Sequence, residues 1–103
     1  MTVINMMISS LTILKALSDE TRFNIIKLLL NGERCVCEIH PNVNVTQSTT
    51  STHLNKLEEA GIIKSRRDGK KVFYHISDKR VIKILQALGD KNKIKTKVKC
   101  HCD

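Results

Sequence analysis

The hydrophobic pattern of this chain changes its period once, and that change limits the possible folds more than any other feature. Before Gly61, apolar residues recur every three or four positions, which is the spacing of amphipathic helices. After Gly61, the segments 62–67 and 70–76 favour strands. The pair Asp68-Gly69 separates them and favours a tight hairpin, because its residues tolerate positive φ. The sequence therefore predicts helices followed by a two-stranded hairpin.

Five segments have the periodicity or the end signals of helices. Four precede the hairpin, at 6–17, 19–30, 33–40 and 47–59, and one follows it, at 78–88. Ser18, Thr46 and Ser77 are expected to cap the second, fourth and last helices, and Pro41 to stop the third. The predicted fold class is α+β and mostly helical.

A chain of 103 residues has room for one domain with one core. We assign residues 1–89 to that domain and residues 90–103 to a basic, mobile tail that ends in Cys-His-Cys. Neither a membrane-spanning run of roughly 20 apolar residues nor a signal peptide is recognisable. We therefore expect a cytoplasmic protein whose four cysteines are thiols or metal ligands rather than disulfides.

The charge of the chain indicates a polyanionic partner. Lys and Arg outnumber Asp and Glu by 18 to 10, which gives a formal net charge of +8. Part of the excess lies in the tail, and part lies in the predicted hairpin. The hairpin residues expected to hold DNA phosphates are Arg66, Arg67, Lys70 and Lys71.

The fourth predicted helix begins with a run of polar residues. Gln can bond adenine at two positions, and Ser and Thr can bond several bases in the major groove, which admits one helix. Base contacts are predicted for Gln47, Ser48, Thr49, Ser51 and Thr52. His53 belongs to the same DNA-binding segment, but packing at the base of the helix or a phosphate contact is expected there ahead of a base contact. A polar helix before a basic hairpin is typical of a winged helix-turn-helix that binds double-stranded DNA.

An enzyme is the competing class, and the sequence argues against it. The chain contains no Gly-rich phosphate loop and no ordered nucleophile and base, and the domain is too small for a roomy pocket. A DNA- or RNA-binding protein without regulatory function also stays possible. Its RNA version is disfavoured because only three aromatic residues are available for base stacking.

Several motifs, in order, resemble the ArsR/SmtB family of small metal-sensing repressors. Segment 17–22 is similar to the opening of that family's second helix, 33–39 to its Cys-Val-Cys metal box and 46–54 to its recognition helix, while 61–63, 68–70 and Tyr74 resemble its wing. The resemblance implies a winged-helix repressor that dimerises through its first and last helices. It also implies an operator that is an imperfect inverted repeat, and release from DNA when a ligand binds.

The metal box of this chain departs from that of the family's arsenic sensors. Cys35 and Cys37 point to different sides of a regular helix, so joint chelation needs an irregular helix start. The third cysteine of those sensors is replaced here by His40, and two thiolates with an imidazole suit zinc or cadmium. A tail thiol, Cys100 or Cys102, is the other candidate ligand, and it would also complete a site for arsenite or antimonite.

Two other roles of the cysteines remain open. In one, Cys35 and Cys37 form a redox switch with the tail pair, and oxidation rather than metal binding alters the dimer. In the other, they are small buried residues and the regulator senses nothing through cysteine.

Overall fold

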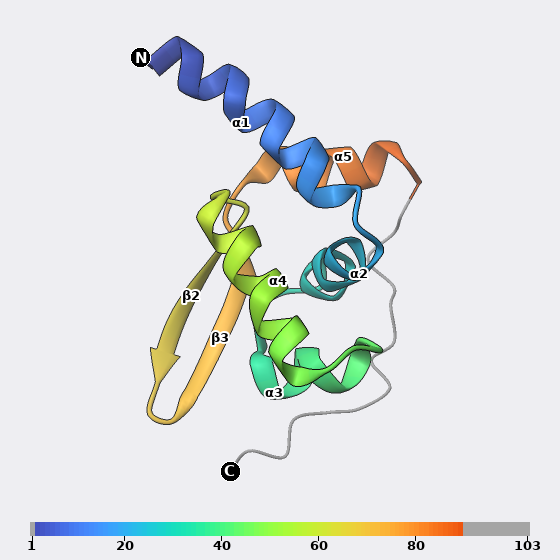
Figure 1. The fold of residues 1–103 in the computed structure, drawn as a ribbon, viewed down its shortest axis with the longest axis vertical. Helices are drawn as coiled ribbons and strands as arrows, with labels where there is room; N and C mark the ends of the chain where they lie inside the picture. Colours follow the sequence, from blue (N-terminus) through green and yellow to red (C-terminus); the bar gives the residue numbers. More distant parts are fainter. Residues whose placement is uncertain (1, 90–103) are drawn as a thin grey trace.

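The computed structural model describes residues 2–89, and the side chains of residues 10–89 (Figure 1). In chain order the elements are α1 (Thr2–Leu17), α2 (Glu20–Leu29), β1 (Arg34–Cys35), α3 (Val36–Ile39), the 3-10 turn His40–Asn42, α4 (Gln47–Glu59), β2 (Ile63–Asp68), β3 (Lys71–Ile76) and α5 (Lys79–Ala87). The predicted helices and hairpin are therefore present. The predicted tail, 90–103, lies outside the described residues. None of the helices in 2–89 has the length and apolar character that a membrane crossing needs.

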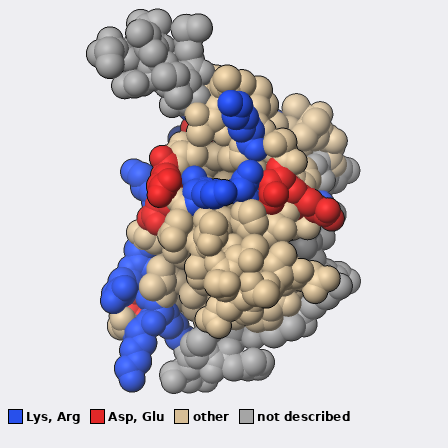
Figure 2. All heavy atoms as spheres, viewed as in Figure 1, with Lys and Arg blue, Asp and Glu red and all other residues tan. Residues whose placement is uncertain are grey.

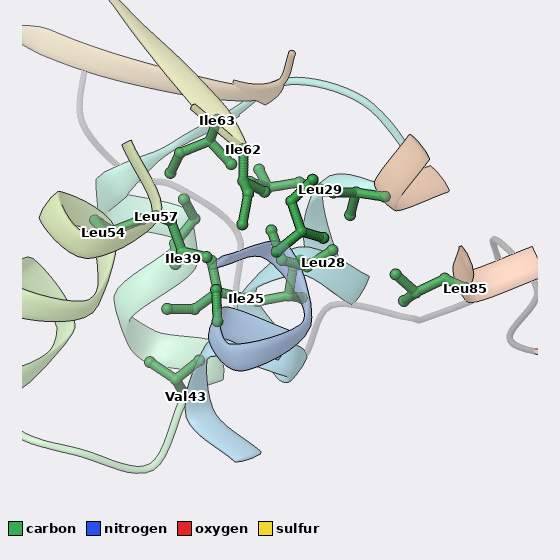
Figure 3. Packing of buried hydrophobic residues seen from close by; sticks show 14 residues of the cluster. Ile25, Leu28, Leu29, Ile39, Val43, Leu54, Leu57, Ile62, Ile63 and Leu85 are labelled. Atoms are coloured by element: carbon green, nitrogen blue, oxygen red, sulfur yellow. The ribbon is translucent and has the colours of Figure 1, made fainter. Parts of the chain in front are cut away.

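The core gathers one apolar stripe from each helix and the base of the hairpin. Figure 3 shows side chains from α2, α3, α4 and α5 packing with Ile62 and with Ile63, the first residue of β2. The fully buried residues of the core include Ile25, Ile26, Ile39, Leu54, Leu57, Ile62, Ile63, Val81 and Leu85. Burial of this apolar area is what holds α4, whose polar first half has little helix propensity of its own.

Two of the three predicted helix caps are wrong by one residue. Asp19 rather than Ser18 caps α2, and Asp78 rather than Ser77 caps α5, each through a carboxylate oxygen that accepts a backbone N–H of the first turn. Aspartate and serine are both good caps, but the charge of aspartate also interacts favourably with the helix N-terminus. The prediction for Thr46 is confirmed, because its hydroxyl accepts from the N–H of Thr49.

The third predicted helix, 33–40, is much shorter than expected. Arg34 and Cys35 form β1, which pairs with β3 in the order β1-β3-β2. Only Val36–Ile39 is α-helical, and Pro41 lies within the following 3-10 turn instead of ending the helix. Proline is tolerated there because the first residues of a helix have no intrahelical use for their N–H groups.

The hairpin turn lies one residue later than Asp68-Gly69 suggested. Asp68 still pairs with Lys71 at the end of the ladder, so the two-residue loop is Gly69-Lys70. Gly69 has φ of 64°, and no other residue type in the described part of the chain has a positive φ. The turn therefore needs glycine at its first central position only, as in the II′ type of hairpin.

Candidate DNA-binding face and cysteine pair

The outer face of α4 presents most of the residues predicted to contact bases. Gln47, Ser48, Ser51 and Thr52 are exposed, and Thr49 is half-buried. On the opposite face, Thr50, Leu54 and Leu57 are buried in the core. The helix therefore has one anchored face and one polar face, which is the arrangement that reading a DNA groove requires.

Hydrogen bonds within α4 use part of the capacity of its hydroxyls. The Thr50 and Thr52 hydroxyls donate to the carbonyls four residues earlier, over 3.1 Å to Thr46 and 2.9 Å to Ser48. A hydroxyl that donates in this way keeps acceptor capacity. Exposed Thr52 can therefore still accept from a base amino group and present its methyl group.

His53 lies at the inner edge of α4 rather than on its outer face. Its side chain is 15% exposed, and its Nδ1 is 3.2 Å from Nη1 of Arg22. Its Nε2 is 3.9 Å from the Asp19 carboxylate, whose pKa is lowered mainly by the N–H bond from Arg22 and further by the charges of Arg22 and His53. The structure thus places His53 where α4 meets the start of α2, which corresponds to its packing alternative.

The basic residues of the hairpin form an exposed flank beside α4. Figure 2 shows Lys and Arg side chains gathered over the hairpin, which projects beside α4 in the same view of Figure 1. Arg67 and Lys70 are exposed, and Lys71 is half-buried. Their charge therefore lies on the same side of the molecule as the hairpin and next to α4.

Arg66 is already paired with Glu33, a contact that no sequence pattern predicted. Its Nε and Nη2 donate to the two carboxylate oxygens of Glu33 over 2.7 and 2.6 Å. Its guanidinium also lies over the Phe73 ring, 4.7 Å from the centroid. The hydrogen bond from Arg66 is the main reason why the pKa of Glu33 is lowered. This contact ties the hairpin to the residue that precedes β1.

Cys35 and Cys37 are joined by a disulfide, which differs from the expected thiols and from the expected bridges to the tail. Cys35 has extended backbone angles and precedes the helix, so its Cα lies 5.2 Å from that of Cys37, within disulfide range. The N–H of Cys37 donates to Cys35 Sγ over 3.2 Å. The irregular helix start needed for joint chelation is thus present, and reduction would leave two adjacent thiols.

His40 is not directed to the cysteine pair. Its Nδ1 is 3.0 Å from Thr50 Oγ1, so it bonds to the buried face of α4. Among the described side chains, no three His, Cys, Asp or Glu residues are grouped to hold a metal ion. The two thiols suit a soft metal ion, but a third ligand is missing from residues 10–89, and Cys100 and Cys102 lie outside the described residues.

Two cavities border the cysteine pair. One, of about 540 Å³, lies between the pair and the hairpin and is lined by Lys70 and Lys71. The other, of about 240 Å³, is lined by Cys37, His40 and Thr50 together with the base-reading candidates Gln47 and Ser51. The pair is therefore next to both elements of the proposed DNA-binding face.

Comparison with known sequences shows that this chain is similar to transcriptional regulators. The sequence model described as "Bacterial regulatory protein, arsR family" matches residues 19–65. An uncharacterised HTH-type transcriptional regulator of Methanocaldococcus jannaschii is 46% identical over 76% of this chain and 89% of its own length. The cadmium resistance regulator CadC of Listeria innocua is 38% identical over 70% of this chain, which spans 61% of that relative. An arsenical resistance operon repressor of Staphylococcus aureus is 36% identical over 76% of this chain and 75% of its own length.

Solved structures give the same fold. HlyU from Vibrio cholerae matches with a TM-score of 0.74 and 31% identity, over 78% of this chain and 87% of that one. A Mycobacterium bovis structure, described as a homodimeric winged helix-turn-helix DNA-binding domain of a possible ArsR-family regulator, matches with a TM-score of 0.73 and 27% identity, over 82% and 78%. The predicted winged helix-turn-helix is therefore confirmed, and the relatives are DNA-binding regulators rather than enzymes.

The tie between Glu33 and Arg66 should depend on pH. Because Arg66 lowers the pKa of Glu33 below its ordinary 4.5, the pair should survive at pH 4.5 and be lost only as the pH falls through that lowered value. The Arg66 Nε–H chemical shift in NMR spectra should keep its paired value above this point and move to the value of a free guanidinium below it. Glu33→Gln should give the free value at every pH, while Glu59→Gln, a loss of the same charge elsewhere, should not. An Arg66 signal unchanged by Glu33→Gln would refute the tie.

Proposed function

Because this chain belongs to the arsR family of bacterial regulatory proteins, we propose that it is a dimeric repressor released from its operator by a thiophilic ion. Cys35 and Cys37 are the proposed sensing residues. The observation that carries the proposal is the adjacency of this pair to both the hairpin and α4. The proposed operator is an imperfect inverted repeat. The proposed location of the protein is the cytoplasm, where it has access to chromosomal DNA.

The exposed face of α4 and the basic hairpin support DNA binding. In the proposed complex, Gln47, Ser48, Thr49, Ser51 and Thr52 face bases in the major groove. Arg67, Lys70 and Lys71 hold phosphates on the flank of the same groove. Arg66 contributes only when it exchanges Glu33 for a phosphate. In a two-fold dimer the two copies of α4 reach successive major-groove faces, roughly 34 Å apart.

Exposed leucines on the first and last helices support the dimer. Leu11 and Leu14 of α1 are 55% and 56% exposed, and Leu88, the C-cap that follows α5, is 65% exposed. The two helices lie together, since Leu14 of α1 and Ile84 of α5 line one small cavity. A second copy would cover this apolar surface in a symmetric interface. The homodimer described for the Mycobacterium bovis relative is consistent with this arrangement.

The relatives and the donor atoms support a soft ion as the inducer. Curated relatives act in cadmium and arsenical resistance, and thiolates are the ligands that select such ions. Cadmium or zinc would be held by Cys35 and Cys37 with His40, Cys100 or Cys102 as a further ligand. Arsenite or antimonite would take a tail thiol as the third sulfur. His40 would first have to give up its bond to Thr50.

The position of the pair suggests how binding would weaken the hold on DNA. An ion at Cys37 changes the wall of the cavity that Gln47 and Ser51 share. A third ligand taken from His40 would also remove a bond to the buried face of α4. Coupling of this kind is typically worth about 1–3 kcal/mol, which changes affinity by roughly 5- to 150-fold.

A redox-responsive regulator is the second candidate, and the disulfide favours it. In this version, oxidation of the pair is the signal, and no ion is required. The two candidates exclude each other within one molecule, because a disulfide sulfur is a poor metal ligand and the thiolate is the ligand form.

The deciding experiment is fluorescence anisotropy of a labelled duplex from upstream of the chain's own gene. Reduced protein is titrated without oxygen, and arsenite, cadmium or zinc is then added. One of the ions should release the duplex. Cys35→Ser should bind DNA with wild-type affinity and lose that response, because one thiolate ligand is missing. Cys102→Ser, the same exchange in the tail, decides whether the tail contributes a ligand. Failure of all three ions to release the wild type would refute ion sensing.

Arg67→Ala and Gln47→Ala should weaken DNA binding in different ways. Loss of a phosphate contact should weaken binding to all sequences and reduce the salt slope by roughly one. In Gln47→Ala, loss of a base contact should instead lower the binding free energy by about 1–3 kcal/mol for duplexes with the preferred base pair, and it should leave the salt slope unchanged. Titrations of operator and scrambled duplexes at several salt concentrations separate the two. A sequence-selective loss in Arg67→Ala would contradict its assignment to phosphate.

Leu14→Glu should break the dimer, because it places a charge in the middle of the proposed apolar interface. Sedimentation velocity at micromolar concentration should show a dimer for the wild type and a monomer for the variant. Asn24→Glu adds the same charge on the exposed side of α2 and should leave the dimer intact. A dimer that persists in Leu14→Glu would place the interface elsewhere.

A further inference from the structure

The larger cavity beside the cysteine pair has the lining of a small-molecule site. It holds about 540 Å³ between the start of α3 and the hairpin turn, far more than a bare ion fills. Its lining contains Cys35 and Cys37 from the start of α3 and Lys70 and Lys71 from the hairpin. Val36 and Val72 add apolar surface to the same lining. The cavity therefore combines a disulfide, a cationic wall and room for a short carbon chain.

The two sulfurs of the disulfide are not equivalent. Cys35 is buried, with 4% of its surface exposed, whereas Cys37 is more accessible. The backbone N–H of Cys37 donates to Cys35 Sγ, and a hydrogen bond of this kind stabilises a thiolate. Burial of Cys35 opposes that effect, so accessibility decides which sulfur is attacked. A small thiol reaches Cys37 Sγ, and Cys35 Sγ leaves with the Cys37 N–H bonded to it.

The charge of the cationic wall selects the attacking molecule. Lys70 and Lys71 contribute two positive charges and Asp68 one negative charge, so the wall attracts an anion. A small thiol that also carries a carboxylate fits both walls, since its carboxylate can face the lysines while its sulfur faces Cys37. A thiol with an ammonium group would be repelled from the same position.

We propose that this cavity binds a small carboxylate-bearing thiol, which opens the Cys35–Cys37 disulfide by attack on Cys37 Sγ. The thiolate sulfur forms a bond to Cys37 Sγ, the disulfide bond breaks, and its electron pair stays on Cys35 Sγ as a thiolate. A second thiolate attacks the bound thiol's sulfur, which releases the small-molecule disulfide and leaves Cys37 as a thiolate. The inference rests on the proposed function, because reduction converts the pair into the form that binds an ion.

A charge series of thiols tests this site without DNA or metal. Oxidised full-length protein is mixed with 3-mercaptopropionate, 2-mercaptoethanol or cysteamine, which are similar in size and carry negative, no or positive charge. Opening is followed by acid quenching, alkylation of new thiols and peptide mass spectrometry. Each rate is divided by the rate of the same thiol with hydroxyethyl disulfide, which removes differences in intrinsic reactivity. The anionic thiol should be roughly tenfold faster than the cationic one after this correction.

Two double variants test whether Lys70 and Lys71 cause the preference for an anionic thiol. Lys70→Gln/Lys71→Gln should equalise the corrected rates of the three thiols, whereas Lys56→Gln/Lys64→Gln removes the same charge outside the cavity lining and should retain the order. The mixed disulfide trapped at early times should be on Cys37. Equal corrected rates in the wild type, or a trapped adduct on Cys35, would overturn the proposal. Release of DNA by ions is measured separately, so failure of either idea leaves the other testable.

Discussion

The pairing of β1 with β3 is the interaction on which the rest of the site depends. Two residues, Arg34 and Cys35, take extended angles to bond with Tyr74 and Phe73 of the hairpin. This pairing delays the start of α3 until Val36, and a cysteine outside the helix can approach one inside its first turn. Had the helix begun earlier, the two sulfurs would have pointed to different sides. The same pairing brings the hairpin alongside the cysteines and closes the cavity between them.

Segment 33–40 is connected to the DNA-binding elements by short contacts rather than through a long path. Glu33 bonds to Arg66 of the hairpin, and His40 bonds to Thr50 of α4. The helix between these two contacts, α3, has only four residues. A shift in the position of Cys37 would therefore affect both contacts directly. Coupling across such distances needs only a segment with two arrangements that both sites influence.

Structural elements that depend on the spacing of many residues could be predicted from the sequence. Features that depend on a single contact could not. The helices, the hairpin and the polar face of α4 follow from repeated spacing of apolar side chains, each position supporting the next. A two-residue strand such as β1 has no period to detect. The tie of Glu33 to Arg66 joins residues 33 positions apart, and nothing local marks the pair. The shift of two caps from serine to the next aspartate reflects the favourable interaction of the aspartate charge with the helix N-terminus, which spacing does not encode.

The cysteine pair imposes an order on the chemistry that it can perform. Ion binding requires both sulfurs as thiolates, whereas the oxidised pair has neither, so reduction must precede sensing. Since Lys70 and Lys71 line the cavity, the proposed reductant would reach the pair most easily when no phosphate occupies these lysines. A DNA-bound dimer would then protect its pair from exchange, and free protein would be the form that is reduced and loaded. By reciprocity of coupling, an ion that weakens the hold on DNA must also bind more tightly to that free form.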